Sequence, residues 1–199
     1  LVTITIILLI SPTVLGTIVK IRYPDDGRYA SALIDQDGDG KYEYVMETDV
    51  WNVVSSSGYL EMTWNYSTAD LFVDINLANI VQENPSSWVH AYPEIWYGAK
   101  PWNNLGPADA GPFTLPKNLS ELNDFYVTVD YNITRVDPNL PFNFCFETWL
   151  TRDTTRNRNV RSNEVEIMIW FSYYGLQGAG SMIDTITQTI QVNDTSKSV

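Results

Sequence analysis

Short runs of β-branched and aromatic residues, each ended by Gly, Pro, Asn or Asp, recur along the chain and constrain its fold more than any other feature. No window shows the period of an amphipathic helix, and the runs have the length and composition of β-strands. The sequence therefore predicts an all-β fold. The predicted strands are 17–23, 42–51, 59–66, 71–81, 88–97, 125–135, 142–151, 165–173 and 185–192.

The length of the chain limits the number of domains. With 199 residues, of which 44% are hydrophobic, the chain can bury one sizeable core. Many strands in one domain without an internal repeat are typical of a β-sandwich or jelly roll of antiparallel sheets. We expect residues 17–199 to form this single domain.

The charge and the rare residue types exclude several classes of function. The chain has 24 acidic and 12 basic residues, a net charge of −12, and a negative surface repels phosphate. We therefore expect no nucleic acid and no stable membrane insertion. Cys145 and His90 are each the only residue of their type, which excludes an intrachain disulfide, and no Ser or Cys lies in a nucleophile motif. We expect a monomer that acts on a neutral substrate without an organic cofactor.

The first sixteen residues, LVTITIILLISPTVLG, combine an apolar run with a Ser-Pro break and small residues. The run is too short to span a bilayer and looks like the apolar core and cleavage zone of a secretory signal, although a buried first strand is an alternative. The charged segment of such a signal is missing, so we expect the natural chain to begin earlier. Four Asn-x-Ser/Thr sequons fit a secreted protein; they begin at Asn65, Asn118, Asn132 and Asn193.

The sequence DQDGDGKYE, residues 35–43, has the alternating acids and glycines of a calcium-binding loop. Hard cations need several oxygen ligands from a tight turn, and three closely spaced aspartates repel one another unless a cation intervenes. The bidentate glutamate of an EF-hand is missing, since Met46 stands in its place. We expect a structural Ca²⁺, and the alternative is an acidic solvated turn. The predicted ligands are Asp35, Asp37, Asp39, the carbonyl of Lys41, and Glu43.

Aromatic residues make up 13% of the chain and include seven tryptophans. Each one can belong to the core or provide a flat apolar surface on which a sugar ring stacks. As a group they indicate a carbohydrate-binding cleft. Trp51 with the adjacent Asn52, and the segment HAYPEIWYGAKPW from His90 to Trp102, are the predicted contacts.

The segment NEVEIMIWF, residues 163–171, predicts a strand with an unusual face. Side chains alternate along a strand, so one side of it would carry Glu164, Glu166, Met168 and Trp170. Positions 165, 167, 169 and 171 are hydrophobic and are predicted to face the core. Hydrolysis of a glycosidic bond uses two carboxyl groups, and Glu166, with its apolar neighbours, is the better candidate. Glu164, next to the loop, is expected at the rim.

A third glutamate belongs to the same hypothesis. Glu147, in FCFETWL, shares a face of its own strand with Trp149. If this strand is a neighbour of the strand that carries Glu166, Glu147 can hydrogen-bond Glu166 and tune its pKa.

Several of these motifs, in this order, resemble glycoside hydrolase family 12, the endo-β-1,4-glucanases and xyloglucanases with a concave β-jelly roll. The nucleophile strand of that family is similar to EVEIMIWF. The archaeal, heat-adapted members are similar in KIRYPDDG, DQDGDG, VHAYPEIWYGAKPW and FETWLTR. The match covers roughly residues 20–192.

The resemblance implies roles for individual residues. It implies a retaining endo-β-1,4-glucanase with Glu166 as nucleophile and Glu147 as the acid that hydrogen-bonds it. Trp51 and Asn52 correspond to the sugar-stacking Trp and its adjacent Asn, and His90, Trp102, Met168 and Trp170 complete the substrate contacts. The substrate would be a β-glucan such as cellulose or mixed-linkage glucan.

The chain departs from the family at one point. The general acid/base of the family is a glutamate in a Gly-Thr-Glu stretch near the C-terminus, and residues 167–199 contain no such motif. We therefore expect the last strands and this acid to lie beyond Val199, and Glu94 is the next candidate for the acid. A non-catalytic carbohydrate-binding sandwich with structural Ca²⁺ is the alternative function.

Overall fold

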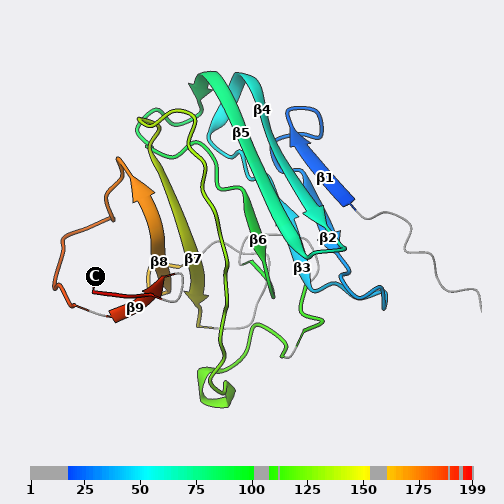
Figure 1. The fold of residues 1–199 in the computed structure, drawn as a ribbon, viewed down its shortest axis with the longest axis vertical. Helices are drawn as coiled ribbons and strands as arrows, with labels where there is room; N and C mark the ends of the chain where they lie inside the picture. Colours follow the sequence, from blue (N-terminus) through cyan, green and yellow to red (C-terminus); the bar gives the residue numbers. More distant parts are fainter. Residues whose placement is uncertain are drawn as a thin grey trace, which may run out of the picture. The chain divides into compact units, whose positions relative to one another are not determined.

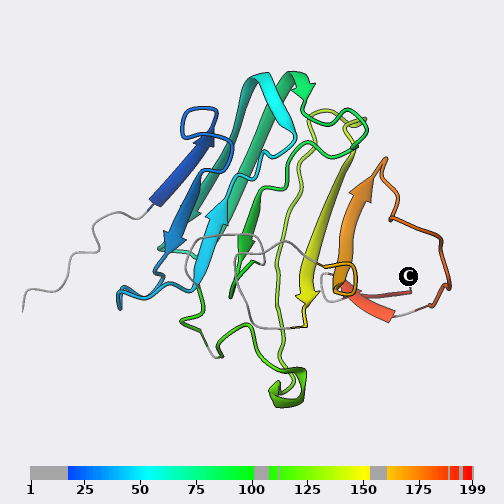
Figure 2. The ribbon, with the colours of Figure 1, turned by 180° about the vertical axis from the view of Figure 1, so that it is seen from behind.

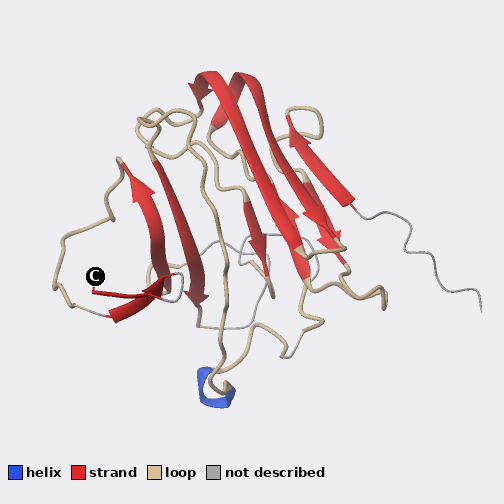
Figure 3. Ribbon diagram, in the orientation of Figure 1, coloured by secondary structure: helices blue, strands red, loops and turns tan. Residues whose placement is uncertain are grey.

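The computed structural model describes residues 18–100, 108–111, 113–152, 161–187, 189–192 and 195–198, the last two ranges by their backbone. Antiparallel strands dominate these residues, and their helical structure is one 3-10 turn, η1 (Leu119–Glu121) (Figure 3). The predicted all-β fold of antiparallel sheets is confirmed. The chain divides into two compact units, one of Leu1–Asp124 with Asp153–Arg161 and one of Phe125–Arg152 with Ser162–Val199.

The first unit contains a sheet of two long strands and one shorter strand. β1 (Ile18–Tyr23), β4 (Val53–Asn65) and β5 (Asp70–Gln82) pair antiparallel in the order β1-β4-β5 (Figure 1). Gly58 allows the close approach of β5, because a Cβ there would lie 1.8 Å from the carbonyl oxygen of Asn76. Its φ of +84° is also a conformation that favours glycine.

A second sheet of the same unit consists of short strands. β2 (Ser31–Ile34), β3 (Tyr44–Glu47) and β6 (Glu94–Trp96) pair antiparallel in the order β2-β3-β6, and Figure 2 shows them from behind. Met46 belongs to the hydrophobic core, and Ile95, which lies opposite it, is half-buried and packs against this core. Since side chains alternate along a strand, Glu47 and its partner Glu94 lie on the opposite face of this sheet.

Both sheets of the first unit contribute to one hydrophobic core. β1 and β4 supply Ile21, Leu60, Met62 and Trp64, and β2 and β3 supply Ile34 and Met46. Four of these side chains, those of Ile34, Met46, Leu60 and Met62, have no exposed surface. Burial of one such side chain contributes about 1.5–3 kcal/mol, so this core is the main source of stability in the unit.

The second unit is organised around a hairpin. β7 (Phe142–Leu150) pairs antiparallel with β8 (Val165–Tyr174), and a shorter ladder joins β9 (Thr189–Val192) to β10 (Thr195–Ser198). The face of β8 that was expected to be core is instead well exposed, with values of 39–53%. Contacts from Tyr131 and Phe144 to Phe171 cover one end of this face. The exposed members are Val165, Ile167, Ile169 and Phe171.

The prediction of a strand at 125–135 is wrong. The segment forms no sheet ladder, although Tyr131 packs on Phe144 with ring centroids 4.7 Å apart and its hydroxyl donates to the carbonyl of Phe171 at 3.4 Å. Strand composition reports how well side chains suit a pleated surface, whereas pairing requires a neighbouring backbone in register. Two strands of four residues, β2 and β10 (Thr195–Ser198), were not predicted from the sequence.

Candidate active site

The β7–β8 hairpin brings Glu147 and Glu166 together on one face. In the antiparallel register Glu147 lies opposite Met168, and Trp149 lies opposite Glu166. Directly opposed residues in such a pair share a face. The two strands are therefore neighbours, as the hypothesis required, and the two carboxyl groups lie on the same side.

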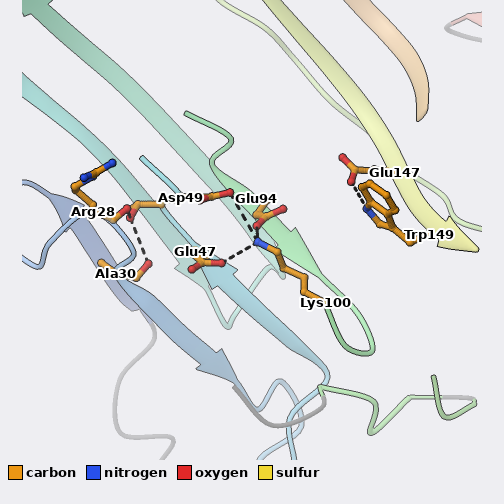
Figure 4. Close-up of polar contacts among 9 residues, drawn as sticks. Arg28, Ala30, Glu47, Asp49, Glu94, Lys100, Glu147 and Trp149 are labelled. Atoms are coloured by element: carbon orange, nitrogen blue, oxygen red, sulfur yellow. Dashed lines mark hydrogen bonds and ion pairs between the residues drawn. The ribbon is translucent and has the colours of Figure 1, made fainter. Parts of the chain in front are cut away.

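The electrostatics of this face favour a bound proton near neutral pH. Partial burial, the negative charge of Glu147 and a hydrogen bond to Glu147 raise the pKa of Glu166 from 4.5 to about 7. The indole N–H of Trp149 donates to Oε1 of Glu147 at 2.5 Å, which fixes the orientation of that carboxyl (Figure 4). Above pH 7 this face presents an ionised Glu166 beside a second carboxyl group.

Apolar side chains extend the same face along β8. Met168 and Trp170 are half-buried, and Trp170 packs on Tyr173 with ring centroids 5.5 Å apart. Glu164, directly before β8, instead accepts a hydrogen bond from the backbone N–H of Arg152 at 3.1 Å. Glu164 therefore fastens the end of a loop, and Glu166 is the glutamate of β8 beside the apolar surface.

The predicted substrate contacts of the first unit fall into different environments. Trp51 and His90 are half-buried, and Trp102 lies outside the described residues. Asn52 has no exposed surface, and its side-chain amide donates to the carbonyls of Asn84 and Val89. The expectation that Asn52 contacts sugar is corrected, because its hydrogen-bonding groups are directed to the protein backbone in this structure.

A cluster of charged side chains on and beside β3 and β6 was not predicted from the sequence. The ammonium of Lys100 lies 3.1 Å from Oε2 of Glu47 and 3.8 Å from Asp49, and it also pairs with Glu94 (Figure 4). The side chain of Lys100 is 11% exposed. Burial raises the pKa of Glu94 to about 7, even though the positive charge of Lys100 opposes this shift. No sequence pattern predicts the ion pairs of Lys100 with Glu47 and Asp49, because these residues are distant from Lys100 along the chain.

The calcium-like loop gathers its acidic groups. Oxygens of Asp35, Asp37, Asp39 and Glu43 lie within 4.8 Å of one another. The carboxyl of Asp35 accepts hydrogen bonds from the backbone of Gly38, Asp39 and Gly40, with distances of 2.8–3.1 Å. Gly38 and Gly40 have φ values of +76° and +86°, so the tight turn depends on glycine. The residues suit a hard cation, and these hydrogen bonds also hold the loop by themselves.

Antiparallel sheets that carry a carboxyl group with a raised pKa beside apolar side chains on one strand face suit an enzyme that hydrolyses glycosidic bonds. Residues 42–196 match the model of glycosyl hydrolase family 12. The match spans most of the chain, and the chain belongs to this family. It is therefore a glycoside hydrolase that acts on polysaccharide, and its fold is the β-jelly roll of the family.

A search of curated proteins found no match. Among the described residues, no helix has the length and apolar character needed to cross a membrane.

Proposed function

We propose that this chain is a secreted, retaining endo-β-1,4-glucanase that hydrolyses cellulose or mixed-linkage glucan by double displacement. The observation that carries the proposal is the position of Glu166 beside Glu147 on the face of the β7–β8 hairpin that also holds Met168. A face with an ionisable carboxyl and an apolar surface suits the anomeric carbon of a bound sugar.

Glu166 acts as the nucleophile in this mechanism. Its carboxylate oxygen attacks the anomeric carbon, the glycosidic C–O bond breaks, and the leaving oxygen takes a proton from a general acid. Water then releases the sugar from Glu166 with retention of configuration. Glu147, oriented by Trp149, hydrogen-bonds Glu166 and sets the pH at which it ionises. No carboxyl of the described residues is assigned to the general acid.

A neutral glucan fits the charge and the aromatic content of the chain. The net charge of −12 disfavours polyanionic substrates, and half-buried indoles such as those of Trp51 and Trp170 offer flat surfaces for glucosyl rings. His90 and Met168 are proposed as further contacts, as is Trp102.

Covalent trapping tests the nucleophile directly. A cellobioside with fluorine at C2 and a dinitrophenolate leaving group needs no proton from a general acid, so the first step depends on Glu166. We expect mass spectrometry of the digested protein to find one fluoro-cellobiosyl group, attached to Glu166. The matched control is Glu164→Gln, which should label like the parent chain, whereas Glu166→Gln should not label. Label on another residue, or no label on the parent chain, would contradict the assignment.

We also propose that residues 1–16 are the end of a secretory signal. The support is the apolar run and the small residues around Gly16. When the gene is expressed in a secreting host, the exported protein should begin near Thr17. An exported protein that retains residues 1–16 would refute this proposal.

Ca²⁺ in the loop 35–43 is proposed as a structural cofactor. The support is the approach of four carboxylates within 4.8 Å of one another, together with the carbonyl that Lys41 can offer. Because a ligand that binds the folded state stabilises it, EDTA should lower the melting temperature by several degrees and excess Ca²⁺ should restore it. Asp37→Asn should abolish this response. Calorimetric titration without binding heat, and a melting temperature that EDTA leaves unchanged, would indicate the solvated turn instead.

A further inference from the structure

The loop between β5 and β6 displays a tryptophan to solvent. Trp88 is 68% exposed in the segment Asn84-Pro85-Ser86-Ser87-Trp88. An indole is among the largest apolar side chains, and leaving it in water forgoes the stabilisation that burial provides. Of the tryptophans among the described residues, Trp88 is the one that the fold leaves mostly exposed.

The loop that carries Trp88 is fastened by the fully buried side chain of Asn52. The amide nitrogen of Asn52 donates to the carbonyl of Val89 at 2.7 Å and to that of Asn84 at 3.2 Å. Its Oδ1 accepts from the backbone N–H of Asn84 at 2.7 Å. The backbone of Asn52 adds two hydrogen bonds, one with His90 at 3.1 Å and one with Glu83 at 3.2 Å. One buried residue thus holds both ends of the loop.

Other contacts order the loop from within and at its base. Gln82 donates to the carbonyl of Ser87 at 2.8 Å, and Ser86 donates to Oδ1 of Asn84 at 3.1 Å. Arg28 forms an ion pair with Glu83 at 2.7 Å and also donates to the carbonyl of Val50 at 3.1 Å. The backbone beneath Trp88 is therefore already ordered before any ligand binds, which lowers the entropy lost on binding.

The surroundings of Trp88 identify the chemistry of its ligand. The loop exposes Asn84, Pro85 and Ser86 beside Trp88, so the indole is its one exposed aromatic group among mostly polar neighbours. A protein partner requires a much larger patch, and a membrane surface repels a chain of net charge −12. A sugar ring, with an apolar face and a rim of hydroxyls, matches a single indole surrounded by amide and hydroxyl groups.

We propose that Trp88 is a carbohydrate-binding platform that stacks a glucosyl unit of a β-glucan chain. This inference rests on the proposed function for its choice of sugar. The loop that carries Trp88 is fastened next to two predicted contacts, because Asn52 follows Trp51 and its backbone N–H donates to the carbonyl of His90 at 3.1 Å. Stacking on Trp88 adds affinity for glucan.

Binding of soluble mixed-linkage glucan, measured by affinity electrophoresis with the 199-residue chain, tests the platform. We expect Trp88→Ala to weaken binding about five- to tenfold, the usual size of one aromatic stacking contact. Trp88→Phe should retain most of the affinity. Tyr126→Ala is the matched control, because Tyr126 is 90% exposed in the other unit, and it should bind as the parent chain does. Equal melting temperatures will show that the variants are folded.

The outcomes separate this inference from the proposed function. Binding by Trp88→Ala equal to that of the parent chain would overturn the platform, as would a parent chain that does not bind glucan or an equal loss in Tyr126→Ala. Covalent labelling of Glu166 would still support the proposed function in each case. Conversely, a loss in Trp88→Ala together with an unlabelled Glu166 would support the platform and contradict the nucleophile.

Discussion

Two glutamates in different units of this protein have a pKa raised to about 7, and their neighbours are opposite in charge. Glu94 lies beside the ammonium of Lys100, and Glu166 lies beside the carboxyl of Glu147. For Glu94, burial dominates over the attraction of Lys100. For Glu166, burial and the neighbouring carboxyl act in the same direction.

The difference between the two sites teaches that a raised pKa does not by itself define a catalytic group. Burial acts to lower the pKa of Lys100. The negative charges of the three surrounding carboxylates outweigh burial and raise this pKa. Such a cluster is satisfied internally and suits a structural role on the face of β3 and β6. The pair of Glu147 and Glu166 contains no cation, and it lies on an exposed strand face where a substrate can approach.

The largest expected effect separates the two glutamates by activity. With dinitrophenyl cellobioside as substrate, Glu166→Gln should lower kcat by at least about 10³-fold, because the nucleophile is lost. Glu94→Gln should remain within about threefold of the parent chain, since a structural carboxyl touches no reacting atom. Release of dinitrophenolate gives both rates. An equal loss in the two variants would remove the distinction between the sites.

A smaller effect is expected from the neighbour of the nucleophile. Glu147→Gln should lower kcat by roughly 10²-fold, because Glu166 loses the carboxyl that orients it. Removing this negative charge also favours the ionised form of Glu166, so its pKa should fall. The acid limb of kcat/KM, which we expect near pH 7 in the parent chain, should therefore move to lower pH. A limb that stays in place would show that Glu147 does not set the pKa of Glu166.

Stability should respond to the cluster of the first unit. Lys100→Met removes the shared cation and leaves buried carboxylates, which costs about 3 kcal/mol in the free energy of unfolding at pH 8. The cost should be smaller at pH 5, where Glu94 holds a proton. Urea unfolding at both pH values measures it. Lys41→Met, at a lysine whose side chain is 73% exposed, is the control and should change stability by less than about 0.5 kcal/mol.

The smallest expected effect is the dependence of stability on pH. The carboxyl of Glu94 titrates near 4.5 in the unfolded chain and near 7 in the folded one, so the folded state binds more protons between these values. The contribution of Glu94 to the free energy of unfolding therefore falls as pH rises from about 4.5 to 7. Glu94→Gln should flatten the curve by about 1–2 kcal/mol across this window. An unchanged slope in urea titrations would contradict the raised pKa.

β8, the strand that carries Glu166, shows which structural features the local sequence can predict and which it cannot. Alternation along residues 163–171 predicted that Glu166, Met168 and Trp170 share a face, and β8 confirms it. The apolar face of the same strand was expected to be buried, yet Ile169 is 51% exposed. Alternation states which side chains share a face, whereas burial depends on what the rest of the chain places against that face.

The environments of Asn52 and Lys100 could not be predicted from local sequence patterns, because they depend on contacts with other parts of the chain. An amide after a tryptophan suggested a sugar contact, but the loop after β5 covers Asn52 and uses its hydrogen-bonding groups. From the sequence alone, Lys100 would be expected at the surface. The pairing of β3 with β6 brings Glu47 and Glu94 together, and their carboxylates hold the ammonium of Lys100. Both side chains take their roles from partners at least five residues away, and mostly from other elements.

By itself the sequence determined the strand-rich composition, the alternation of β8, the acidic loop and the family to which the chain belongs. These properties depend on neighbouring residues, whose side chains have fixed spacing along a strand or a turn. Tertiary structure alone decided that 125–135 remains outside a ladder, that Asn52 is buried, and that two glutamates reach a pKa near 7 by different routes. Strand pairing, burial and charge interactions depend on groups that are distant along the chain, and only folding brings these groups together.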